Sequence, residues 1–286
     1  MTQPLAYLDE RFLESAEGRP MRILAEYLEP LRRFRAQKIQ DTVVFFGSAR
    51  VNSRERAERA LNTLRARGVQ QADEQYEAEL TKSRKAVEWA RYYEDARELA
   101  RLLTAWSTGL ASENHRFVVT SGGGPGIMEA ANRGAREAGG KTIGLNIRLP
   151  FEQGANPYLT DGLHFEFHYF FMRKFWFAYL AKALVVFPGG FGTCDELFEI
   201  LTLVQTDKLS KKIDIVLYGS EYWDQVLSFK PMVEWGAIAE FDLDLLQRAD
   251  NPQDAFEHLR ANLMANHLEP ATAQEAKAPG IAKTRG

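Results

Sequence analysis

Short apolar runs alternate with longer amphipathic segments along most of the chain. Apolar runs of strand length lie at residues 41–46, 117–120, 141–147, 185–187 and 213–218, and residues 164–167 alternate between polar and apolar positions. The segments between them predict helices at residues 83–107, 127–138, 169–181, 195–206, 220–235 and 252–266. Strands that alternate with helices predict an α/β fold, with a doubly wound, Rossmann-like parallel sheet covered by helices on both faces.

The first forty residues carry a helical pattern of their own. After a break near residues 18–20, apolar positions recur three and four residues apart, at Leu24, Tyr27, Leu28 and Leu31. Pro30 falls inside this stripe and is expected to kink or end the helix. We therefore predict extra N-terminal helices, over residues 1–40, ahead of the sheet.

The domain that contains the sheet is predicted to span residues 41–266. Within it, residues 51–80 are charged and helical and carry no recognisable chemistry. Residues 267–286 are rich in alanine, proline, lysine and glycine, so we predict a disordered tail.

Composition restricts the class of protein. The 286 residues carry a net charge of −3, so no global basic field recruits a nucleic acid polymer. The single cysteine, Cys194, excludes an intrachain disulfide and a cysteine-rich zinc site, and it fits a reducing compartment. The N-terminus lacks the basic-then-apolar order of a signal peptide, and the most apolar stretch, residues 165–187, is interrupted by three cations. We therefore expect a cytoplasmic protein without a membrane span.

Three strand exits carry candidate chemistry. They are Gly47-Ser48, the glycine loop at residues 121–126 and the glycine loop at residues 188–193. The carboxyl ends of parallel strands meet at one edge of a sheet, where open α/β sheets bind ligands. Both glycine loops lead into helices, whose first N–H groups are free to bind an anion. Together they predict a phosphorylated ligand, a nucleotide with a single phosphate.

The loop at residues 188–193 is followed by an acid in the first turn of its helix. Thr193 is expected to cap that helix or to donate its hydroxyl to a phosphate oxygen. Glu196 would repel a phosphate, so its position favours action on an electron-poor part of the same ligand; alternatively it only favours the helix dipole. Glu129 follows the other glycine loop, where it either contacts a ribose hydroxyl or is simply a first-turn acid.

The glycine loops do not match two widespread nucleotide motifs. The third glycine position of the dinucleotide fingerprint must hold a small residue, but Glu129 occupies it here. The next strand also ends in residues 146–148, Asn-Ile-Arg, and lacks the acid that would hold a ribose. No Gly-Lys-Ser/Thr follows either loop, as a triphosphate loop requires. The five histidines make no convincing metal site, and no cofactor is predicted.

Together these motifs resemble the Lonely Guy (LOG) family of nucleoside-monophosphate phosphoribohydrolases, and the likeness is closest to its longer bacterial members. The hallmark Pro-Gly-Gly-x-Gly-Thr-x-x-Glu is matched in full by residues 188–196, and the Arg-Lys pair of the preceding helix by Arg173 and Lys174. The strand exit and the triple glycine also match, at Gly47, Ser48, Gly122, Gly123 and Gly124. The resemblance covers roughly residues 41–235.

The resemblance implies hydrolysis of the N-glycosidic bond of a nucleoside 5′-monophosphate, such as AMP or a cytokinin riboside monophosphate. It implies catalysis by Arg173 and Glu196 at a homodimer interface. A carboxylate at Glu196 would stabilise the ribosyl cation and orient the attacking water. The substrate-binding residues are then expected to be Gly47, Ser48, Gly122, Gly123, Gly124, Met172, Lys174, Gly189, Gly190, Gly192 and Thr193.

Two other functions have been considered for proteins of this kind. The family was once labelled lysine decarboxylase, which would require a lysine Schiff base to pyridoxal phosphate, and no lysine of this sequence stands out for that role. The second is a non-catalytic nucleotide-binding protein, like the molybdenum-cofactor carriers that the family resembles. Retention of both Arg173 and Glu196 favours the enzyme, because binding alone does not require the pair.

Overall fold

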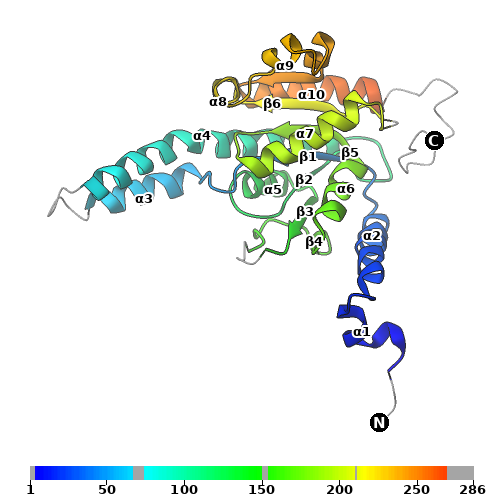
Figure 1. The fold of residues 1–286 in the computed structure, drawn as a ribbon. Helices are drawn as coiled ribbons and strands as arrows, with labels where there is room; N and C mark the ends of the chain where they lie inside the picture. The colour runs from blue at the N-terminus through cyan, green and yellow to red at the C-terminus, as the bar shows by residue number, and fades with distance from the viewer. Residues whose placement is uncertain (1–3, 67–73, 150–153, 210, 269–286) are drawn as a thin grey trace.

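The computed structural model describes residues 4–66, 74–149, 154–209 and 211–268. Its centre is a single seven-stranded sheet in which every neighbouring pair of strands is parallel (Figure 1). The strands are β1 (Thr42–Phe46), β2 (Val118–Ser121), β3 (Thr142–Ile147), β4 (His164–Phe167), β5 (Ala181–Val186), β6 (Asp214–Tyr218) and β7 (Leu246–Ala249). The predicted α/β fold is therefore confirmed.

Helices and short 3-10 turns connect these strands. They are η1 (Ala6–Leu8), α1 (Glu10–Glu14), α2 (Arg19–Ala36), α3 (Arg54–Ala66), α4 (Glu74–Thr108), α5 (Ile127–Glu137), α6 (Phe170–Leu180), α7 (Phe191–Gln205), α8 (Ser220–Val226), α9 (Lys230–Glu234), η2 (Glu240–Leu245) and α10 (Pro252–His267).

The strand order places a topological switch beside the first strand. Across the sheet the order is β4-β3-β2-β1-β5-β6-β7. The chain thus builds outwards from β1 to β4, returns to β5 on the other side of β1, and builds outwards again to β7. In doubly wound sheets the ligand crevice forms at this reversal, outside the carboxyl ends of the strands. The loops after β1 and β5 are therefore the expected site.

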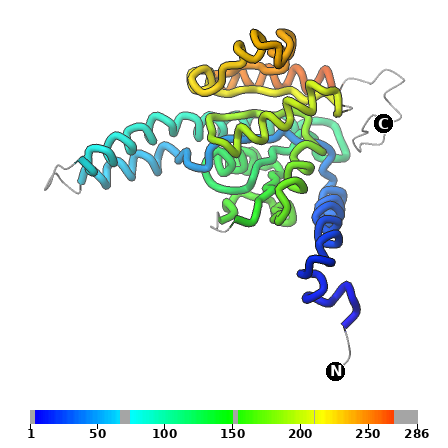
Figure 2. The backbone as a smooth tube through the Cα atoms, in the orientation of Figure 1, coloured from blue at the N-terminus to red at the C-terminus, as the bar shows by residue number. Residues whose placement is uncertain are grey.

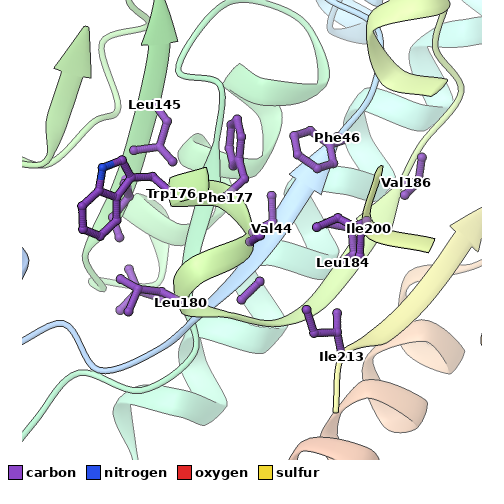
Figure 3. Close-up of a cluster of buried hydrophobic side chains, with 14 of the residues drawn as sticks. Val44, Phe46, Leu145, Trp176, Phe177, Leu180, Leu184, Val186, Ile200 and Ile213 are labelled. Carbon is purple, nitrogen blue, oxygen red and sulfur yellow. The ribbon is translucent and has the colours of Figure 1, made fainter. Parts of the chain in front are cut away.

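Side chains of the central strands pack alternately on the two faces of the sheet. Val44 and Phe46 of β1 belong to a core cluster with Trp176 of α6 and Leu197 of α7, part of which is drawn in Figure 3. Val43 and Phe45 of β1 belong to the opposite cluster, which includes Leu99 of α4, Ala130 of α5 and Leu259 of α10. Burial on both faces explains the unbroken apolar runs of the parallel strands.

Helix α2 continues through Pro30, so an end of the helix at this proline is wrong. A proline has no N–H, which leaves the carbonyl of residue 26 without its helical donor. The indole Nε1–H of Trp176 on α6 donates to Glu26 O at 2.9 Å instead. The missing helical bond is thus replaced by a contact between α2 and the core.

Helices α3 and α4 extend away from the sheet as a two-helix arm (Figures 1 and 2). A small cluster of Leu61, Leu64 and Leu80 packs between the two helices. Helix α4 begins at Glu74, nine residues before the predicted start, because its outer part packs on α3 rather than on the sheet.

Several predicted boundaries at the C-terminal side differ from the structure. The single helix predicted for residues 220–235 is two short helices, α8 and α9. Strand β7 was not predicted, because Leu246–Ala249 is a polar edge strand with one buried residue. His267 closes α10 instead of opening the predicted tail, and residues 269–286 of that tail lie outside the described residues. Among the described residues, no helix combines the length and apolar character needed to cross a membrane.

Candidate active site

A cavity of about 700 Å³ lies at the switch point between β1 and β5. The loops after β1, β2 and β5 contribute to its wall, as do α6, α7 and α8. Its lining consists of Phe46, Gly47, Ser48, Ala49, Arg50, Gly122, Met128, Arg173, Phe177, Gly189, Gly190, Phe191, Gly192, Thr193, Cys194, Glu196, Tyr222 and Val226. The three strand exits singled out in the sequence therefore meet at one cavity.

The loop after β5 presents backbone N–H groups to this cavity. Helix α7 begins at Phe191, and no side chain caps it. The N–H of Cys194 bonds to Gly190 O at 3.0 Å, which leaves the N–H groups of Phe191, Gly192 and Thr193 without an intrahelical acceptor. A helix N-terminus of this kind favours an anion through its free donors and its dipole.

The carbonyl groups of the same loop are held by neighbouring elements. The Ser48 N–H donates to Pro188 O at 3.0 Å, and the Tyr222 hydroxyl donates to Gly189 O at 2.8 Å. These two bonds occupy the acceptors of the loop and leave its donors free. The loop is thereby fixed from β1 on one side and from α8 on the other.

Thr193 does not cap α7, because the helix starts four residues earlier than expected and Gly190 is its N-cap. Of the two expected roles of Thr193, donation of its hydroxyl to a phosphate oxygen stays a prediction. Thr193 is instead buried in the first turn and remains part of the cavity wall. A Cβ at Gly189 would lie 2.1 Å from Thr193 Oγ1, so a glycine is required there to admit the threonine.

Neither the backbone conformation nor the packing of the chain requires a glycine at Gly190 or Gly192. Gly190 has an ordinary φ of −92°, and Gly192 is not among the residues with positive φ. A Cβ added at either position would meet no atom within 4 Å. The free space beside them lies at the free N–H groups, where a ligand would have to approach the backbone closely.

Arg173 of α6 and Glu196 of α7 meet in the cavity wall. Arg173 Nη2 donates to Glu196 Oε1 at 3.1 Å, and the two side chains are 16% and 6% exposed. Burial raises the pKa of Glu196 to about 7, although the charges of Arg173 and Lys174 act to lower it. Burial also lowers the pKa of Arg173, an effect that the charge of Glu196 opposes. Glu196 can therefore gain or lose a proton near neutral pH.

Only one residue of the Met172-Arg173-Lys174 run faces the cavity. Lys174 Nζ binds Asp195 at 2.8 Å and Glu199 at 2.9 Å and is not part of the cavity lining. Met172 lines a separate apolar groove of about 630 Å³ between α2 and α6. Consecutive helical residues point about 100° apart, so three in a row cannot share one cavity. The structure thus separates Met172 and Lys174 from the predicted site.

The triple glycine contributes a single residue to the cavity. Gly122 lies in the wall, and a Cβ there would be 3.9 Å from Arg173 Nη1. Gly123 has a φ of +74°, and its Cβ would lie 3.1 Å from Gly144 Cα of β3. The side chain of Asn156 donates to Gly124 O at 3.1 Å. Gly123 and Gly124 are therefore occupied by contacts within the chain and do not line the cavity.

Glu129 does not line the cavity, and this decides between the two roles considered for it, a contact with a ribose hydroxyl and a first-turn acid. Its carboxylate accepts the Tyr93 hydroxyl at 2.7 Å and contacts Arg56 Nη1 at 3.2 Å. These partners belong to α4 and α3, so Glu129 joins the two-helix arm to α5. The residue is a buried first-turn acid with a structural role.

Several lining residues were not singled out in the sequence. Tyr222 and Val226 come from α8, which folds back over the cavity after β6. Arg50 lies two residues after Ser48, and this proximity could have drawn attention to it. Burial raises the pKa of the Cys194 thiol, which disfavours the thiolate that a nucleophile requires. Among the described residues, no group of three or more potential ligands could hold a metal ion.

Comparisons with known proteins agree with the expected resemblance. The model of a family described as "Possible lysine decarboxylase" matches residues 128–259. The chain is 31% identical over 126 residues to a cytokinin riboside 5′-monophosphate phosphoribohydrolase of Rhodococcoides fascians, which covers 43% of this chain and 61% of that protein. It is also 31% identical over 130 residues to the phosphoribohydrolase LOG of Oryza sativa subsp. japonica, which covers 43% and 50%. The match thus spans about half to three fifths of the relatives' length.

Solved structures are more distant. A Moco carrier protein from Chlamydomonas reinhardtii is 21% identical, covers 61% of this chain and 89% of its own, and gives a TM-score of 0.40. A likeness at this level carries no argument about function. The lining residues likewise give no support to a decarboxylase, because no lysine is among them to form a Schiff base.

Proposed function

We propose that this chain hydrolyses the N-glycosidic bond of a nucleoside 5′-monophosphate to a free base and ribose 5-phosphate. One observation carries the proposal. A buried carboxylate, Glu196, stands in the same cavity as the free N–H groups that begin α7. The relatives named as cytokinin riboside 5′-monophosphate phosphoribohydrolases support this reaction class.

In this reaction the phosphate serves as an anchor. The N–H groups of Phe191, Gly192 and Thr193 bind its oxygens, and the bonds from Ser48 and Tyr222 keep the loop in position. An anchored phosphate fixes the ribose relative to the helix on which Glu196 lies. Binding energy from a part of the substrate that does not react is thereby used to orient the part that does.

Glu196 then acts on the ribose. Cleavage of the N-glycosidic bond passes through an oxocarbenium-like ribosyl cation, and a carboxylate beside it stabilises the positive charge. The ionised carboxylate also accepts a hydrogen bond from the attacking water and orients it. Glu196 is the only carboxylate among the lining residues, so both roles fall to it.

Arg173 keeps Glu196 in place and favours its ionised form. Its guanidinium cannot act as a general base, because it remains protonated. The bond from Nη2 orients the carboxylate, and the positive charge opposes the rise in pKa that burial causes. Without this cation, the pKa of the buried Glu196 would lie higher still, and less of the carboxylate would be ionised to stabilise the ribosyl cation.

We further propose that the substrate is AMP or a cytokinin riboside monophosphate, and that the chain works as a homodimer or larger homo-oligomer in the cytoplasm. The exposed aromatic residues of α6, Phe170, Phe171 and Phe175, are available for a contact between subunits. The alternative is a nucleotide carrier of the same fold without catalysis. The Arg173–Glu196 pair favours hydrolysis, because a carrier gains nothing from a carboxylate beside its anion site.

Product analysis tests the proposal. The purified protein is incubated with AMP, GMP, CMP and isopentenyl-AMP, and the products are separated by chromatography. We expect a free base and ribose 5-phosphate from at least one substrate, and none from the Glu196→Gln variant. Binding of a nucleotide without release of base would refute the hydrolase and favour the carrier.

A further inference from the structure

The cavity contains one cation that no carboxylate neutralises. Three lining residues carry a full formal charge, Arg50, Arg173 and Glu196. Arg173 forms an ion pair with Glu196, with Nη2 at 3.1 Å from Oε1. Within the part of the chain that the structure describes, the Arg50 guanidinium has neither an ion pair nor a side-chain hydrogen bond. An arriving phosphate would therefore meet Arg50 as its only uncommitted counter-ion.

Arg50 is attached to the anion-binding loop through the backbone. Its N–H donates to Ser48 Oγ at 3.1 Å, and the Ser48 N–H donates to Pro188 O at 3.0 Å. The turn that carries Arg50 is thus bonded directly to the start of the glycine loop. Since Ser48 Oγ accepts the bond from Arg50, the Ser48 hydroxyl proton remains free for a ligand oxygen.

We propose that Arg50 binds the phosphate of the ligand and thereby selects phosphorylated ribosides over unphosphorylated ones. A guanidinium matches two phosphate oxygens at once and provides charge-assisted bonds that the backbone N–H groups cannot. Arg173 then pairs with Glu196, while Arg50 binds the phosphate. The choice of a riboside ligand rests on the proposed function, whereas the role in phosphate binding does not.

The test compares Arg50→Gln and Arg50→Lys with Arg54→Gln. Arg54 is the matched control, because it is an exposed arginine four residues further along that lies outside the cavity lining. Binding of ribose 5-phosphate is measured by titration calorimetry, and KM and kcat are measured with AMP. Loss of charge-assisted bonds predicts a rise of about tenfold to a hundredfold in Kd and KM for Arg50→Gln. We expect KM to change more than kcat, because the phosphate contact forms in the ground state and persists in the transition state.

The other variants exclude a general effect of charge or structure. Arg50→Lys keeps the cation but not the paired donors, so it should recover part of the affinity. Arg54→Gln should bind as the wild type does. An unchanged Kd in Arg50→Gln, or an equal loss in Arg54→Gln, would overturn the proposal.

The hydrolase activity and the role of Arg50 can be refuted separately. If the wild type cleaves AMP and Arg50→Gln does so with a normal KM, the role of Arg50 is refuted and the hydrolase stands. If ribose 5-phosphate binding depends on Arg50 but no nucleotide is cleaved, the hydrolase is refuted and the role of Arg50 stands.

Discussion

Two glycine loops leave the sheet on either side of β1, and they use their glycines differently. In the loop after β2, Gly126 has a φ of +72°, and a Cβ there would lie 2.3 Å from Ser48 O. The helix that follows gives its first N–H, from Ile127, to the same Ser48 O at 3.1 Å. In the loop after β5, Gly190 and Gly192 face open space, and the first N–H groups of α7 have no intrahelical partner.

The acids that follow the two loops differ in the same way. Glu129 is held by Tyr93 and Arg56 and joins three helices. Glu196 has Arg173 as its one hydrogen-bond partner among the described residues, and it lines the cavity. One loop is therefore part of the architecture, and the other has donors, space and a carboxylate left over for a ligand. Similar sequence motifs can thus serve packing in one place and binding in another.

The largest expected effect separates the two acids. Glu196→Gln should lower kcat on the best nucleotide about a thousandfold, because the amide cannot stabilise the ribosyl cation as a carboxylate does. Glu129→Gln should leave kcat within a few fold and lower the free energy of unfolding by about 1–2 kcal/mol, because it weakens a buried bond. Steady-state kinetics and denaturant unfolding of both variants check this. Equal losses of kcat would contradict the distinction.

The second prediction concerns the architectural loop. Gly126→Ala should lower the free energy of unfolding by at least about 3 kcal/mol, because a methyl group would collide with backbone and the φ of +72° disfavours alanine. Urea denaturation measures the loss. A variant as stable as the wild type would mean that the contact with Ser48 O does not restrict this loop.

The third prediction uses the pKa of Glu196, which burial raises to about 7. If the reaction needs the ionised carboxylate, kcat/KM should rise about tenfold per pH unit below pH 7 and level off above it. A profile that is already level at pH 5 would show that ionisation of Glu196 does not limit the reaction.

The pH dependence of the free energy of unfolding gives an independent check on the pKa of Glu196. The pKa of Glu196 in the folded chain lies above the ordinary value of 4.5, so the unfolded chain releases this proton first. Ionisation of Glu196 therefore opposes folding, and the stability of the wild type relative to Glu196→Gln should fall from about pH 4.5 to about pH 7. The difference should then stay constant at higher pH.

The smallest expected effect lies in the binding loop. Gly192→Ala should leave the free energy of unfolding unchanged or raise it by up to about 1 kcal/mol, because alanine favours a helix and its Cβ meets no atom. The same methyl group should weaken ribose 5-phosphate binding about tenfold by occupying the space beside the free N–H groups. Unchanged binding in a calorimetric titration would show that the ligand does not approach this residue.

Much of the fold could be predicted from the sequence, because buried parallel strands leave long apolar runs. The six predicted strands are present, and the order of strands and helices gave the sheet type. Strand β7 lacks such a run, since it lies at the sheet edge and pairs only with β6. Continuation of α2 through Pro30 was beyond prediction as well, because it depends on Trp176, a residue far away in the sequence.

The site was predictable as a set of strand exits but not as a cavity. The sequence brings Gly47, the two glycine loops and the Arg173–Glu196 pair into one region. It does not reveal that Gly126 packs on the carbonyl of Ser48, 78 positions earlier. Nor does it reveal that Tyr222 of α8 donates a hydrogen bond to Gly189 O. Whether a glycine serves packing or binding depends on such distant neighbours.

The most direct test of the account is a crystal structure of the Glu196→Gln variant with AMP. The account predicts the phosphate within hydrogen-bonding distance of the N–H groups of Phe191, Gly192 and Thr193, with the anomeric carbon of the ribose beside residue 196. A phosphate bound instead by the loop of Gly122–Gly124, with the ribose remote from residue 196, would contradict both the division between the two loops and the proposed reaction.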